Sequence, residues 1–156
     1  MIEKFYEGQS LQDILKKKKV LNPGIAEKVF KEIVKSLEYL VSKRVMHRDL
    51  KPDNIIVNDK HETFLIDLGF ATLISPEDPV SLNERFGTPF YMSPEMMSNK
   101  KYNSKSDIWS LGVIYYEMLY GHLPFYGNSD TELFKDIMQT KVDIFKKNES
   151  ISMKTK

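Results

Sequence analysis

The segment from His47 to Asn54 constrains the fold more than any other part of this chain. Its eight residues include a histidine, two cations, two carboxylates and an amide. Short runs of β-type residues flank the segment, Val45-Met46 before it and 55–57 after it. Two small strands that bracket a polar loop can hold its side chains near those of a second polar loop. We therefore expect small strands around the polar residues, with the core supplied by other elements.

Helical periodicity predicts most of the remaining structure. Asn22-Pro23 is a typical helix start, and apolar residues recur at helical spacing from there to about Lys43. A nearly all-round apolar helix is predicted over 107–120, ended by Gly121. We also expect helices at 10–19, capped by Ser10, and at 130–140, a strand at 63–66 and an irregular segment at 69–94. The predicted fold class is mainly α (α+β), with small β-hairpins at the polar loops.

Composition narrows the function classes. The 156 residues suffice for one domain, and a net charge of +1 provides no field that would attract nucleic acid or a membrane surface. We expect neither partner, and the N-terminus resembles neither a signal peptide nor a membrane span. The absence of cysteine excludes thiolate catalysis and zinc–thiolate sites and fits a reducing compartment. An intracellular, cytoplasmic location is expected, with the nucleus as the alternative.

Three oxygen-bearing side chains suit phosphoryl transfer, which requires an aligned nucleophile and neutralised phosphate charge. Asp49 could accept or orient the proton of a substrate hydroxyl. Asn54 and Asp67 are hard oxygen ligands for Mg²⁺, and Lys51 could reach the transferred phosphoryl group. The alternative is that these residues only form turns, because Asp, Asn and Asp-X-Gly are common there.

Four motifs, in this order, resemble the C-terminal lobe of a eukaryotic protein kinase of the serine/threonine type. They lie at 47–54, 67–69, 87–95 and 107–113. The separation of Asp49 from Asp67 (67 − 49 = 18) matches the family, as does that of Asp49 from Asn54 (54 − 49 = 5). The resemblance implies a partial kinase domain over 1–156. Within it we expect a hinge at about 1–10, a catalytic loop at 47–54, an activation segment at 67–95 and a core helix at 107–120.

The resemblance also implies roles for single residues. Asp49 and Lys51 are the implied catalytic residues. The implied nucleotide-binding residues are Glu3, Asn54, Ile56 and Asp67. The implied metal ligands are Asn54 and Asp67. Structural or regulatory roles fall to His47, Arg48, Glu84, Thr88, Glu95 and Asp107, and substrate contact to Thr88 and Glu117. The implied cofactors are ATP and Mg²⁺, and the implied substrate is a protein serine or threonine.

Three of these implied roles specify a contact with another residue. Asp107 is expected to tie the backbone of the catalytic loop in place. Arg48 is expected to face a phosphate or an acid, and Glu84 is its candidate partner, the alternative being a solvated glutamate. Glu95 pairs with a later arginine in relatives, but this chain has arginines only at 44, 48 and 85. We therefore expect Glu95 to lack that partner.

The chain contains no Gly-X-Gly-X-X-Gly loop and no Val-Ala-Ile-Lys-like strand. We therefore expect a C-terminal lobe alone, with the N-terminal lobe absent, or supplied by another segment or a partner chain. The favoured reading is a fragment of an active serine/threonine kinase that is weak or inactive alone. A non-catalytic, kinase-like binding module is the alternative, and a small-molecule phosphotransferase ranks last.

Overall fold

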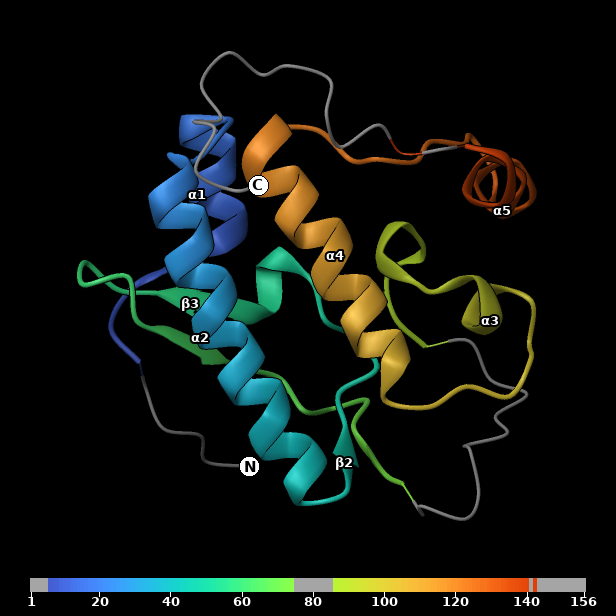
Figure 1. Cartoon of the computed structure of the whole chain (residues 1–156), viewed down its shortest axis with the longest axis horizontal. Coiled ribbons are helices and arrows are strands. Elements are labelled where there is room, and N and C mark those ends of the chain that lie inside the picture. The colour runs from blue at the N-terminus through green and yellow to red at the C-terminus, as the bar shows by residue number, and fades with distance from the viewer. Residues whose placement is uncertain (1–5, 75–85, 141, 143–156) are drawn as a thin grey trace.

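The computed structural model describes residues 6–74, 86–140 and 142, and there helices dominate, with two small antiparallel sheets (Figure 1). The helical elements are α1 (Leu11–Lys18), α2 (Pro23–Ser42), η1 (Pro52–Asn54), η2 (Pro89–Tyr91), α3 (Pro94–Met97), α4 (Lys105–Tyr120) and α5 (Asp130–Gln139), where η marks a 3-10 turn. The strands are β1 (Gln9–Ser10), β2 (Val45–Met46), β3 (Ile55–Val57), β4 (Thr63–Leu65) and β5 (Thr72–Leu73). The predicted class, mainly α with small antiparallel sheets, is confirmed.

The first two helices begin where their capping residues predict. The Ser10 hydroxyl accepts a hydrogen bond from the backbone amide of Asp13 at 3.0 Å, which satisfies one orphan donor of α1. The Asn22 side chain accepts from the amide of Gly24 at 2.9 Å, and Pro23 occupies the first turn of α2. Both predicted helix starts are therefore confirmed.

The apolar helix predicted over 107–120 is α4, which begins two residues earlier, at Lys105. It ends at Gly121, whose backbone adopts a left-handed φ of 74° that glycine accommodates without strain. Polar residues in its first turns are buried along with the apolar ones, Asp107 and Ser110 among them. Among the described helices, none combines the length and apolar character needed to cross a bilayer.

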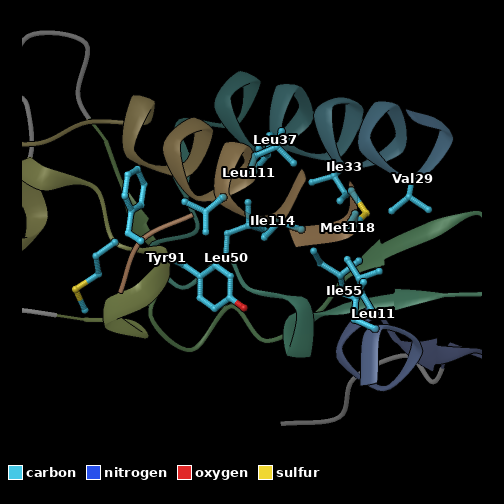
Figure 2. Close-up of a cluster of buried hydrophobic side chains, with 14 of the residues drawn as sticks. Leu11, Val29, Ile33, Leu37, Leu50, Ile55, Tyr91, Leu111, Ile114 and Met118 are labelled. Atoms are coloured by element: carbon cyan, nitrogen blue, oxygen red, sulfur yellow. The ribbon is translucent and has the colours of Figure 1, made fainter. Parts of the chain in front are cut away.

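The core lies between α2 and α4, which pack along each other (Figure 2). Val29, Ile33 and Leu37 from α2 face Leu111, Ile114 and Met118 from α4, and each of these side chains is buried. Leu50 and Ile55 extend the core beneath the polar loop, so the middle and the C-terminal end of the 47–54 segment are anchored in apolar packing. Each fully buried aliphatic side chain contributes about 1.5–3 kcal/mol of transfer free energy.

The strands form two separate sheets. In the first, the strand order is β1-β3-β4, and in the second, β2 pairs with β5. Among the described strands, only β3 and β4 form a hairpin, so the prediction of a hairpin at the polar loop between β2 and β3 is wrong. The partner of β2 is β5, which lies beyond Asp67, with Met46 opposite Thr72. The strands β1 and β5 were not predicted, because two residues carry no visible alternation. This pairing brings the chain after Asp67 back to the start of the polar loop.

The segment 69–94 is less irregular than predicted. It contains β5 and η2, and α3 starts at its last residue. The prediction of an irregular segment rests on its prolines, which break regular patterns, yet Pro89 and Pro94 each stand in the first turn of a helical element. Proline is favoured there because its missing N–H is not needed and its φ is preset. The frayed end predicted from Lys146 onward lies outside the described residues.

Candidate active site

Helix α4 anchors the polar loop through Asp107, which is 4% exposed. Its carboxylate accepts hydrogen bonds from the backbone amides of His47 (2.9 Å) and Arg48 (3.0 Å). Burial raises the pKa of the Asp107 carboxyl, and the two amide donors oppose that rise. Arg48 has a left-handed φ of 68°, a costly conformation that surrounding contacts must hold. The structure thus contains the contact that the resemblance implies for Asp107.

Asp49 lies at the centre of the loop and is 4% exposed. Its Oδ2 is 2.8 Å from Nζ of Lys51 and accepts from Nδ2 of Asn54 at 3.2 Å. Its Oδ1 accepts from the backbone amide of Thr88 at 3.1 Å. A carboxylate has about four lone-pair sites, so three donors leave room for one further hydrogen bond. The arrangement therefore retains the capacity to accept from an incoming hydroxyl.

His47 is fully buried beneath this carboxylate. Its Nδ1 accepts from the backbone amide of Asp49 at 3.3 Å, which places the proton of a neutral imidazole on Nε2. Nε2 has no hydrogen-bond partner among the described residues. The geometry gives His47 a part in holding the loop backbone and no path to a substrate proton.

Asn54 and Asp67 are brought together by the backbone. The amide of Ile66 donates to the carbonyl of Asn54 at 3.0 Å, so Asp67 emerges directly beside the end of the loop. Asp67 is exposed, has a φ of 62°, and uses Oδ1 to accept from the amide of Gly69 at 3.0 Å. The described residues contain no group of three His, Cys, Asp or Glu side chains suited to a metal. A cation here would need further ligands from a phosphate or water.

Arg48 has different partners from those expected. Its Nε donates to the carbonyl of Phe70, and its guanidinium carbon lies 4.6 Å from the centre of the Phe86 ring. A cation over an aromatic face at this distance is attracted by the ring quadrupole. The predicted partner, Glu84, lies outside the described residues. Sequence reasoning missed Phe70 and Phe86, although each directly adjoins a glycine of a predicted motif.

The side chain of Glu117, the expected substrate contact, is partly buried. Its Oε2 accepts from the hydroxyl of Tyr91 at 2.8 Å. Burial raises the pKa of the Glu117 carboxyl, and the Tyr91 hydrogen bond lowers it by a smaller amount. Burial also raises the pKa of the Tyr91 phenol. One of the two carboxylate oxygens of Glu117 thus already accepts a hydrogen bond within the protein.

Glu95 has a different partner from the arginine that pairs with it in relatives. Its carboxylate accepts from the hydroxyl of Ser106 at 3.1 Å, and Ser93 and Ser106 share a buried hydrogen bond of 2.9 Å. A neutral hydroxyl replaces a cation as the donor. The result links α3 to the first turn of α4 through short polar side chains.

The residues expected to bind a nucleotide base are placed only in part. Ile56 lies in β3, opposite Ser10 of β1 and Phe64 of β4, and is half-buried. Glu3 lies outside the described residues. One cavity of about 350 Å³ opens between α1 and β3, and another of about 500 Å³ lies beside α5. Neither cavity is lined by Asp49, Asn54 or Asp67, so the polar cluster is not part of these two hollows.

Comparison with known proteins agrees with the motif order. The protein kinase domain model matches residues 1–156. The chain is similar to the serine/threonine-protein kinase TIO of Arabidopsis thaliana, with 39% identity over 91% of this chain and 11% of that protein. It is also similar to the cAMP-dependent protein kinase catalytic subunit of Schizosaccharomyces pombe, with 35% identity over 92% of this chain and 27% of that protein. A third relative is serine/threonine-protein kinase atg1 of Dictyostelium discoideum, with 35% identity over 92% of this chain and 22% of that protein.

The chain spans about a tenth to a quarter of the length of these three relatives. All three relatives are protein kinases, and two of them are named as serine/threonine kinases. Together with the match of the domain model over the full chain, they show that this chain belongs to the protein kinase family.

Proposed function

We propose that this chain forms the C-terminal lobe of a serine/threonine kinase and carries the residues that transfer a phosphoryl group from ATP to a protein hydroxyl. The observation that carries the proposal is the environment of Asp49. Its buried carboxylate is held by three donors and retains room for a fourth. A residue that only forms a turn needs none of this preorganisation.

In the proposed mechanism Asp49 accepts a hydrogen bond from the serine or threonine hydroxyl and orients its lone pair toward the phosphoryl group. Lys51, 2.8 Å from the same carboxylate, is partly exposed and can turn its ammonium toward the transferred phosphate. The amide of Thr88 fixes the other carboxylate oxygen. Positioning of this kind supplies most of the catalysis in phosphoryl transfer.

Asn54 and Asp67 fit a magnesium ion that is bound together with the nucleotide. The Nδ2 of Asn54 donates to Asp49, so its carbonyl oxygen is the atom free to face a cation. Asp67 uses one oxygen on the Gly69 amide and keeps the other. Two protein oxygens suffice because Mg²⁺ commonly takes its other ligands from phosphates and water. When bound, the ion neutralises charge on the phosphates.

We further propose that residues 1–156 alone bind Mg-ATP weakly and turn over little. The sequence has no Gly-X-Gly-X-X-Gly loop to cover the phosphates, and the candidates for the floor of an adenine site are Ile56 and hinge atoms beside Leu11. The cover would come from another segment or a partner chain. Loss of such positioning groups costs orders of magnitude in rate.

Substrate choice would depend on Glu117 and Thr88. The Tyr91 hydroxyl donates to Oε2 of Glu117, so the other carboxylate oxygen can accept a further hydrogen bond. A basic residue near the phosphoacceptor could approach it. We therefore propose a mild preference for basic substrates, which a positional peptide library would measure.

The decisive experiment joins residues 1–156 to a nucleotide-covering lobe from a serine/threonine kinase and measures transfer of radiolabelled phosphate to protein. We expect transfer that Asp49→Asn reduces by at least about a hundredfold. Asp53→Asn is the matched control, because Asp53 is an exposed carboxylate on the same loop. A folded chimera that transfers no phosphate would instead favour the non-catalytic binding module. Equal transfer by the Asp49→Asn and Asp53→Asn variants would favour it as well.

A further inference from the structure

The half-buried Phe86 side chain connects three segments that are distant in sequence. Its ring lies under the guanidinium of Arg48, with 4.6 Å between the guanidinium carbon and the ring centre. The same ring packs against Phe70 at 5.3 Å between centroids, within the range of favourable aromatic pairs. Arg48 closes the triangle by donating from Nε to the carbonyl of Phe70. The loop around Asp49 and the chain after Asp67 are thus joined through one aromatic ring.

The residue after Phe86 contacts the same arginine through its backbone. Gly87 has a φ of 106°, and a Cβ at this position would lie 2.9 Å from the carbonyl oxygen of Arg48. The next residue, Thr88, donates its amide to Oδ1 of Asp49. Side-chain stacking at 86 and close backbone approach at 87 therefore precede the contact that orients the carboxylate.

We propose that Phe86 is a positioning residue whose ring, stacked on Arg48, holds the 86–88 segment so that the Thr88 amide reaches Asp49. The inference deepens the proposed function and rests on it, since Asp49 is there the group that orients the substrate hydroxyl. The planar guanidinium needs a flat partner, so position 86 requires an aromatic side chain and a hydrophobic one of similar size does not suffice.

Phe86→Leu and Phe86→Tyr test this requirement in the chain 1–156. Leucine keeps much of the apolar volume but has no π face, whereas tyrosine keeps the face. Phe30→Leu is the matched control, because the ring of Phe30 packs against that of Tyr115 with 4.6 Å between centroids, and Phe30 lies on α2 and not on the loop. The readouts are amide hydrogen exchange at Thr88, with the core amide of Ile33 as reference for global unfolding, and the NMR shift of the Arg48 Hε proton.

We expect Phe86→Leu to speed exchange at Thr88 by about threefold to thirtyfold relative to Ile33, the factor that one cation–π contact contributes. The Arg48 Hε signal should lose its ring-current shift. Phe86→Tyr should restore both values. Phe30→Leu should change neither, although it removes a ring from another aromatic pair. Arg48→Lys, which keeps the charge without the planar group, should resemble Phe86→Leu.

Equal exchange at Thr88 in Phe86→Leu and Phe30→Leu would overturn the proposal, as would a failure of Phe86→Tyr to restore it. These readouts need neither ATP nor turnover. Their outcome is therefore separate from that of the phosphotransfer experiment, which can fail while the Phe86 contact is real.

Discussion

The backbone amide of His47 lies 2.9 Å from Oδ2 of Asp107, across 60 residues of sequence. The other carboxylate oxygen accepts from the next amide, that of Arg48. One buried side chain on α4 thus fixes two consecutive peptide groups immediately before Asp49. Because α4 is itself packed into the core against α2, the position of the Asp49 backbone is tied to the hydrophobic core.

Asp107→Asn should lower the free energy of unfolding by about 2 kcal/mol. An amide offers one acceptor atom in place of two and turns an NH₂ group toward a backbone donor, which leaves a buried group unsatisfied. Urea unfolding followed by Trp109 fluorescence measures the change. Asp53→Asn, at an exposed position, should stay within about 0.5 kcal/mol. Equal losses in the two variants would show that the Asp107 contacts contribute little.

Two glycines should respond in opposite directions to alanine. Gly87→Ala places a Cβ 2.9 Å from the Arg48 carbonyl at a φ of 106°, so it should cost more than about 1 kcal/mol and detach Thr88 from Asp49. Gly112→Ala meets nothing within 4 Å among the described residues and lies inside α4. It should stabilise the chain by about 0.5–1 kcal/mol, because alanine favours a helix. Thermal unfolding of both variants checks the signs, and stabilisation by Gly87→Ala is the result that contradicts the geometry.

Local rules predicted the elements with long patterns or strong caps. Ser10, Asn22 and Gly121 each mark a helix end with one side chain or one backbone preference, so these boundaries could be read from the sequence. The strands β1 and β5 could not, because two residues show no period and their formation depends on distant partners. Pro94 was misread for a related reason: a proline breaks a helix interior but favours a helix start.

The candidate site shows the same difference between features set by local sequence and features set by distant contacts. The motif spacing predicts candidate oxygen ligands on the 47–54 loop and after Ile66, because such motifs occupy short stretches of chain. It could not predict the partners of Arg48, because Phe70 and Phe86 approach from opposite ends of another segment. Nor could it predict that Ser106 takes the place of an arginine at Glu95, since a serine hydroxyl carries no charge signal.

Glu117 should make the free energy of unfolding fall as pH rises from 4 to 7. Burial raises the pKa of its carboxyl in the folded protein, so the protonated form is favoured there. Its contribution to stability is complete below the ordinary value of 4.5 and is lost as pH rises through the raised folded value. Glu117→Gln cannot ionise, so its stability relative to the original chain should increase from pH 4 to pH 7. Urea midpoints at both values measure the difference.

The Tyr91→Phe variant gives a second test of the raised Glu117 pKa. The Tyr91 hydroxyl lowers the pKa of Glu117 by donating to its carboxylate. Removing the hydroxyl should raise the Glu117 pKa further and enlarge the loss of stability between pH 4 and pH 7. The same pH dependence in the original chain and both variants would show that Glu117 does not titrate differently on folding.

The most direct test of the account asks whether Asn54 and Asp67 face one metal–nucleotide complex. Mn²⁺ can replace Mg²⁺ as a paramagnetic probe of oxygen ligands, and it reports even on weak binding by broadening nearby NMR signals. We expect Mn²⁺ with ATP to broaden the side-chain amide of Asn54 and the backbone amide of Asp67 in residues 1–156. The effect should require ATP and disappear in Asp67→Ala. Broadening confined to other acidic surface positions, or unchanged by Asp67→Ala, would contradict the proposed site.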